Sequence, residues 1–255
     1  MQLTMPGELA EGYKSASQRA RVVSEAWAEE NLYCANCTSR ELAACPTNTE
    51  AVDFLCPECE APFQLKSQSR PFTSRVTDAA FAAMVRAIRA GRNPNLFVLH
   101  YDMVRWHVLN LLLVPRFSFS ISALEKRKPL SPSARRSGWI GCNIVLRNFP
   151  TDAKISVVSD GVIADPIIVR RQFERLRPLE KLKIDARGWT LDVLNIVRGL
   201  GRREFTLAEV YAEEAALGRL HPQNRFVRPK IRQQLQILRD LGFVEFLGDG
   251  SYRLM

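Results

Sequence analysis

The chain has 255 residues, 46% of them hydrophobic and 25% charged, a composition typical of a soluble globular protein with a full core. Its formal net charge of +9 favours a polyanionic partner, because Lys and Arg that neutralise phosphates release condensed counterions. The longest aliphatic run, residues 108–114, is far too short to span a bilayer, and residues 1–15 lack the pattern of a secretion signal. We therefore expect a cytoplasmic protein.

Apolar residues at helical spacing predict a first helix within residues 13–34, with Ser15 or Ser17 as its cap. Two C-x-x-C pairs follow, separated by eighteen residues. The pairs are Cys34 with Cys37 and Cys56 with Cys59. This spacing predicts a structural zinc site, since four thiolates close a tetrahedron and leave no open position for catalysis. Unrelated free cysteines are the alternative.

The second cysteine pair is flanked by two short segments with strand character, residues 51–54 and 62–67. A hairpin that turns at this pair would bring Asp53 beside Gln64 and Lys66, which share one face of a strand because side chains alternate. An acid, an oxygen ligand and a lysine at one sheet edge resemble the site of PD-(D/E)xK nucleases.

In such a site Asp53, the Gln64 amide oxygen and the Leu65 carbonyl would bind Mg²⁺, and Lys66 would orient the attacking water. Taken alone, this pattern also occurs by chance. Gln64 stands where the usual residue is Glu or Asp, and an amide brings no negative charge, so the site is expected to be weakened or inactive. Glu25, Glu29 or Glu30 could add a carboxylate from the first helix, although ordinary solvated glutamates are the alternative.

Farther along, residues 77–94 have the apolar spacing of an amphipathic helix that covers a sheet, and residues 95–102 and 106–115 have the pattern of strands. Strands mixed with helices predict an α/β core. Between residues 116 and 147 the chain has seven Lys or Arg and one acid, Glu125. A solvated face or a nucleic-acid contact would explain this excess equally well.

The loop-like segment 125–143 concentrates several candidate DNA contacts. Its arginines would contact phosphates, and its tryptophan could pack against a base or a methyl group. The alternative for the tryptophan is that it anchors the loop to the core. The candidates here are Arg127, Arg135, Arg136, Trp139 and Asn143.

Three helical segments and a β-hairpin in the last part of the chain predict a winged helix. Its second helix, residues 206–220, begins with a Thr206/Glu209 capping box, and its third, residues 228–242, would enter the major groove. A winged helix can also bind protein. The residues expected on the outer side of the third helix are Arg228, Lys230, Arg232, Gln233 and Gln234.

Four features occur in order: Asp53 before a C-x-x-C pair, "FQLKS" (63–67), "RKPLSPSARRSGWIGCNI" (127–144) and "KIRQQLQILRDLGFVEF" (230–246). Together they resemble the DpnI-type, or Dam-replacing, restriction endonucleases nearly end to end. The resemblance implies a zinc-containing PD-(D/E)xK-like nuclease domain (residues 1–181) and a winged-helix domain (182–255). By that match Asp53, Gln64 and Lys66 take the catalytic positions, and the family has Glu where Gln64 stands.

The implied function is that of a type II endonuclease that hydrolyses double-stranded DNA at GATC sites carrying N6-methyladenine. Both domains would recognise the site, with structural Zn²⁺ and catalytic Mg²⁺ as cofactors, and we expect a monomer in solution. One rival is a methylation- or sequence-dependent DNA-binding protein whose nuclease has lapsed through Gln64. Another is a zinc-ribbon transcription factor without nuclease ancestry, which would leave Asp53 and Lys66 far apart.

Overall fold

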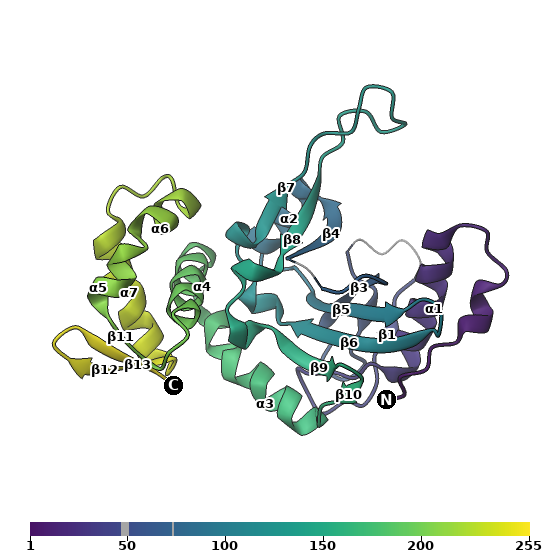
Figure 1. Cartoon of the computed structure of the whole chain (residues 1–255), viewed down its shortest axis with the longest axis horizontal. Helices are drawn as coiled ribbons and strands as arrows, with labels where there is room; N and C mark the ends of the chain where they lie inside the picture. Colours follow the sequence, from purple (N-terminus) through teal and green to yellow (C-terminus); the bar gives the residue numbers. More distant parts are fainter. Residues whose placement is uncertain (47–50, 73) are drawn as a thin grey trace.

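A seven-stranded sheet forms the centre of the computed structural model, which describes residues 1–46, 51–72 and 74–255 (Figure 1). Its strand order is β1-β2-β3-β5-β6-β9-β10, and β3 runs parallel to β5 while the other neighbours are antiparallel. The central strand β5 is buried along almost its whole length, and the last four residues of β6 are buried beside it, so the core lies at the middle of the sheet. Its strands are β1 (Ala43–Ala44), β2 (Phe54–Leu55), β3 (Pro62–Gln68), β5 (Asn95–Asp102), β6 (His107–Val114), β9 (Ile155–Ser159) and β10 (Val162–Ile163).

Helices α1 (Ala16–Asn31) and α3 (Pro166–Leu176) pack on this sheet, α1 against β3 and α3 against β9. Trp27 of α1 has no exposed surface and donates its indole N–H to the carbonyl of Gln2 at 2.8 Å. Helix α3 begins with an Asp165 cap whose side chain accepts the Ile167 N–H at 2.8 Å. Helix α3 therefore begins at a side-chain cap, whereas α1 begins after Ser15 without a side-chain cap hydrogen bond, unlike the cap expected from Ser15 or Ser17.

A smaller sheet, ordered β4-β8-β7, packs near α2 (Phe81–Arg89). Its strands are β4 (Arg75–Ala80), β8 (Gly141–Val145) and β7 (Leu124–Lys126). The helix expected from residue 77 begins only at Phe81, because residues 77–80 pair with β8 instead. Residues 127–140, which join β7 to β8, project away from the body (Figure 1).

Short 3₁₀ helices connect the larger elements. They lie at Gly7–Ala10, Arg116–Ser118, Ile121–Ala123, Leu146–Asn148, Thr151–Ala153 and Arg177–Lys181. Among the described residues, no helix has the length and apolar character needed to cross a bilayer.

The C-terminal part contains α4 (Ile184–Gly199), α5 (Leu207–Ala212), α6 (Glu214–Leu220) and α7 (Val227–Asp240) beside a small sheet. That sheet, ordered β11-β13-β12, consists of β11 (Glu204–Thr206), β12 (Val244–Gly248) and β13 (Ser251–Leu254). The Thr206/Glu209 capping box is present as predicted, but the helix expected over 206–220 divides at Glu213. The predicted α/β fold with a winged-helix part is confirmed.

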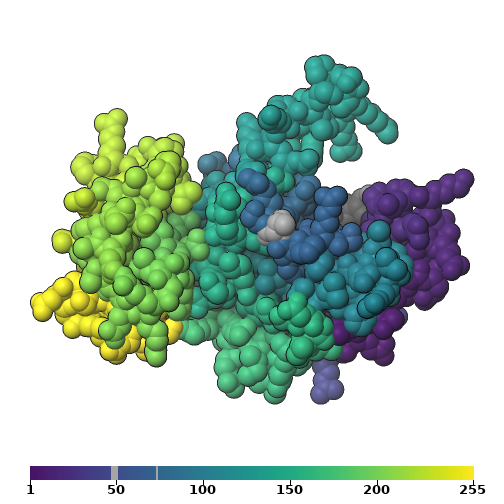
Figure 2. Space-filling view, in the orientation of Figure 1, coloured from purple at the N-terminus to yellow at the C-terminus, as the bar shows by residue number. Residues whose placement is uncertain are grey.

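The C-terminal part forms a lobe beside the α/β body (Figure 2). Polar contacts join them, among them the pair of Arg198 with Asp152 at 2.6 Å and the hydrogen bond from the Ser122 hydroxyl to Asp192 at 2.7 Å. The Asn195 amide also donates to the Arg147 carbonyl at 3.1 Å. Asp192 also lies 2.7 Å from His221. The boundary between the two domains, expected between residues 181 and 182, stays a prediction.

Candidate active site

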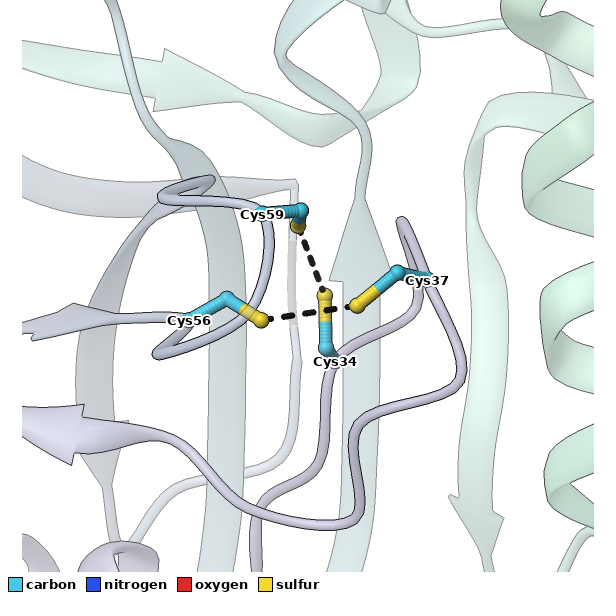
Figure 3. A group of neighbouring side chains, drawn as sticks. All are labelled: Cys34, Cys37, Cys56 and Cys59. Atoms are coloured by element: carbon cyan, nitrogen blue, oxygen red, sulfur yellow. Dashed lines mark hydrogen bonds between the residues drawn. The ribbon is translucent and has the colours of Figure 1, made fainter.

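The four cysteines of the two C-x-x-C pairs converge on one point, with all Sγ atoms within 4.8 Å of one another (Figure 3). Sγ–Sγ distances of 3.7 Å between Cys34 and Cys59, and 3.5 Å between Cys37 and Cys56, fit a tetrahedral zinc site. Zn–S bonds of about 2.3 Å place tetrahedral sulfurs about 3.8 Å apart. The cluster is therefore compatible with zinc, as predicted.

The environments of these thiols differ. Burial raises the pKa of the Cys34 thiol, and it raises that of Cys37 to about 11. At Cys56 burial also acts upward, but the backbone N–H groups of Cys59 and Glu58 outweigh it and bring the pKa to about 7. Zinc is bound by thiolates, so these thiols would lose their protons on binding it.

Two arginines of the α3 region brace the first cysteine turn (residues 34–39). Arg170 donates to the carbonyl oxygens of Cys34 at 3.0 Å and Ser39 at 2.8 Å. Arg177 donates to the side-chain oxygen of Asn36 at 3.1 Å. Their positive charges also lie near a site that four thiolates would make negative. Neither arginine was predicted, because they lie more than 130 residues away in the chain.

Strands β2 and β3 form the predicted hairpin, with the second cysteine turn (residues 56–59) between them. Phe54 pairs with Phe63, and the Cys56 N–H donates to the Ala61 carbonyl at 3.0 Å. Glu60, at the end of the turn, has a left-handed backbone conformation with φ of 57°. The cysteine cluster thus fixes the turn that aligns the two legs of the hairpin.

Asp53 lies directly beside the middle of β3. Its Oδ2 accepts the backbone N–H of Leu65 at 2.7 Å. Because the N–H and C=O of one strand residue point to the same side, the Leu65 carbonyl faces the same edge. The Asp53 carboxylate and the Leu65 carbonyl therefore lie at the same edge of β3, and their joint binding of one hard cation stays a prediction.

Gln64 and Lys66 precede and follow Leu65 in β3, so their side chains lie on the face opposite the Leu65 side chain. Gln64 is buried, with 5% of its surface exposed. The Lys66 ammonium lies 2.7 Å from Oδ1 of Asp78, a β4 residue whose side chain has no exposed surface. The sequence did not single out Asp78.

One glutamate of α1 interacts electrostatically with this hairpin. Burial raises the pKa of the Glu25 carboxyl, Arg21 opposes this, and the charge of Asp53 adds to the increase. The neighbouring Ser24 hydroxyl contacts the Ser67 hydroxyl of β3 at 3.0 Å. The Glu25 carboxyl is thus close enough to the hairpin to be influenced by the charge of Asp53.

The projecting loop carries the predicted basic residues on an exposed surface: Arg127, Arg135 and Arg136 are all exposed. Trp139 is half-buried and lies over Gly141, where an added Cβ would come within 2.8 Å of the indole ring. The Asn143 amide donates to Glu125 at 3.2 Å. Trp139 and Asn143 therefore both contact the base of the loop, whereas the arginines remain accessible.

On α7, Arg228, Arg232 and Gln233 are exposed and Lys230 is half-buried, on the outer side as predicted. Arg228 and Arg232 lie 5.3 and 6.0 Å from the Tyr211 ring centroid, which holds them as cation–π partners.

Gln234 does not share this outer surface. It has no exposed surface, and its amide oxygen lies 2.7 Å from the Thr190 hydroxyl of α4. The prediction that Gln234 faces DNA is wrong, because it follows Ile231 by three residues and so belongs to the inward face.

Comparison with known proteins finds a matching family model for each of the two parts of the chain. The family model described as DpnI, Dam-replacing family, matches residues 1–182. A second model, described as the Dam-replacing HTH domain, matches residues 185–254.

Proposed function

Because this chain belongs to the DpnI, or Dam-replacing, family, which implies a methylation-dependent restriction nuclease with a DNA-binding helix-turn-helix domain, we propose that it cuts adenine-methylated DNA. The proposed substrate is double-stranded DNA whose GATC sites carry N6-methyladenine. The proposed reaction is Mg²⁺-dependent hydrolysis of the phosphodiester backbone, and the cysteine cluster is proposed to hold structural zinc.

The single observation that carries this proposal is the contact of the Asp53 carboxylate with the Leu65 backbone at 2.7 Å, one residue from Lys66. Asp53, the Leu65 carbonyl and the Gln64 amide would hold the ion. Mg²⁺, when bound, would activate the attacking water and neutralise charge on the phosphate. Lys66 would orient that water and stabilise developing negative charge.

Recognition is assigned to two surfaces. The exposed arginines of the 127–140 loop would contact phosphates and set the register, and the outer face of α7 would enter the major groove. There Arg228 or Arg232 can pair with guanine and Gln233 with adenine, the bases of a GATC site. Trp139 is retained as a candidate methyl contact, since it is only partly buried at the base of the loop.

The test is digestion of methylated and unmethylated plasmid with Mg²⁺ or Mn²⁺, using the zinc-loaded protein and its Lys66→Ala variant. We expect cutting of the methylated plasmid only, and a loss of about 100-fold or more in rate for Lys66→Ala with unchanged DNA binding. Lys14→Ala, which alters an exposed lysine, serves as the control. Unchanged cutting by Lys66→Ala, or loss of its DNA binding, contradicts the catalytic assignment.

A second candidate function is methylation-dependent DNA binding without efficient cutting. It is favoured by Gln64, which leaves one carboxylate fewer among the proposed ion ligands of the hairpin. The Gln64→Glu variant separates the two candidates. If the natural protein binds methylated DNA but does not cut it, and Gln64→Glu cuts, then the amide is the cause.

A further inference from the structure

Asp78 is a buried carboxylate in direct contact with the proposed catalytic lysine. Its side chain has no exposed surface, and its Oδ1 lies 2.7 Å from the Lys66 ammonium. Apart from this ion pair, neither carboxylate oxygen accepts a hydrogen bond from any described residue. A buried carboxylate with so few partners is costly, which indicates that the site retains it for its charge.

The strand that carries Asp78 also supports the projecting basic loop. Asp78 pairs with Cys142 of β8, and a bulge follows where Ala80 pairs with Gly141, the residue after the loop. Burial raises the pKa of the Cys142 thiol to about 11, and the charge of Asp78 adds to that increase. Asp78 therefore lies between the hairpin that holds Lys66 and the strand pair that presents the loop.

The three proposed site side chains of the hairpin, Asp53, Gln64 and Lys66, together carry no net charge at neutral pH. Asp53 is negative, Lys66 is positive and Gln64 is neutral. A divalent cation is poorly retained where the surrounding side chains carry no net negative charge. Adding Asp78 makes the set negative, and the contact with Lys66 locates that charge beside the site.

We propose that Asp78 is a positioning residue that holds the Lys66 ammonium and supplies the second negative charge that Gln64 lacks. This inference rests on the proposed nuclease function. It assigns to β4 a negative charge that the side chains of Asp53, Gln64 and Lys66 do not together provide. It also connects the geometry of Lys66 to the strand pair from which the basic loop projects.

The test compares Asp78→Asn, Gln64→Glu and the double variant with the natural protein, all zinc-loaded. Calorimetry measures the Mg²⁺ dissociation constant, and single-turnover digestion of methylated plasmid measures the cutting rate at each Mg²⁺ concentration. We expect Asp78→Asn to weaken Mg²⁺ binding at least 10-fold and the double variant to recover most of the loss. A purely structural role of Asp78 would not be rescued by a glutamate at position 64.

Asp152→Asn is the matched control, since it removes another partly buried ion pair, the one with Arg198, away from the hairpin. It is expected to leave the Mg²⁺ dissociation constant unchanged. Thermal unfolding verifies that each variant is folded, and Asp78→Ser replaces Asp78→Asn if the asparagine variant is not.

The outcomes separate the two proposals. Equal Mg²⁺ binding by the natural protein and Asp78→Asn, or no recovery in the double variant, overturns the role of Asp78 alone. A natural protein that binds Mg²⁺, loses it on Asp78→Asn and never cuts methylated DNA supports Asp78 and refutes the nuclease function.

Discussion

Replacing Gln234 by alanine is expected to destabilise the C-terminal lobe, whereas the same change at Gln233 is expected to weaken DNA binding only. Gln234 is fully buried and its amide oxygen lies 2.7 Å from the Thr190 hydroxyl. A buried hydrogen bond contributes about 1 kcal/mol net. The lost buried methylene adds about 0.8 kcal/mol. The expected loss of stability for Gln234→Ala is therefore about 2 kcal/mol.

The assay is thermal unfolding of both variants beside the natural protein. For a chain of this size 1 kcal/mol shifts Tm by about 2–4 °C, so Gln234→Ala is expected to lower Tm by about 4–8 °C. Gln233→Ala is exposed and should stay within about 0.5 kcal/mol of the natural protein. Equal Tm values for the two variants would refute the assignment of Gln234 to the interior. Unimpaired binding of methylated duplex by Gln233→Ala would refute the assignment of Gln233 to DNA.

Three further perturbations test the cysteine cluster and the basic loop. Cys56→Ser removes one of the four proposed zinc ligands, so elemental analysis should find less zinc and proteolysis near the hairpin should be faster. A full zinc content in this variant would contradict the zinc site. Arg170→Ala removes the brace on the first cysteine turn and should speed zinc transfer to a chelating dye, whereas Arg171→Ala, exposed on the same helix, should not. Arg135→Ala with Arg136→Ala should reduce the slope of log affinity against log salt by about 2, and an unchanged slope would remove the loop from the DNA interface.

The sequence predicts well where its signals are local. The cysteine spacing and the alternation of residues 62–67 together specify the hairpin, and the structure forms it with Asp53 against β3. Residues 77–80 were expected to belong to the amphipathic helix that the apolar spacing within residues 77–94 predicts. They form a strand because β8, more than 60 residues later, supplies pairing partners. Asp78 lies in this segment, so no local pattern could indicate its contact with Lys66.

Gln234 is a different case, since the signal was present in the sequence. Ile231, Leu235 and Leu238 define the buried stripe of α7, and Gln234 occupies the position three after Ile231 and four before Leu238. Helical periodicity alone places it inward. Gln233 and Gln234 do not share the outer face, because adjacent residues of a helix point about 100° apart.

The brace on the cysteine cluster has a consequence for the order of assembly during synthesis. All four thiol ligands lie within a short stretch that leaves the ribosome early, so metal can be captured by a nearly local loop. Arg170 and Arg177 arrive only after more than 110 further residues have been made. A nascent or truncated chain that stops before α3 would therefore hold its metal in an unsupported turn, open to exchange and thiol oxidation until the distant helix docks.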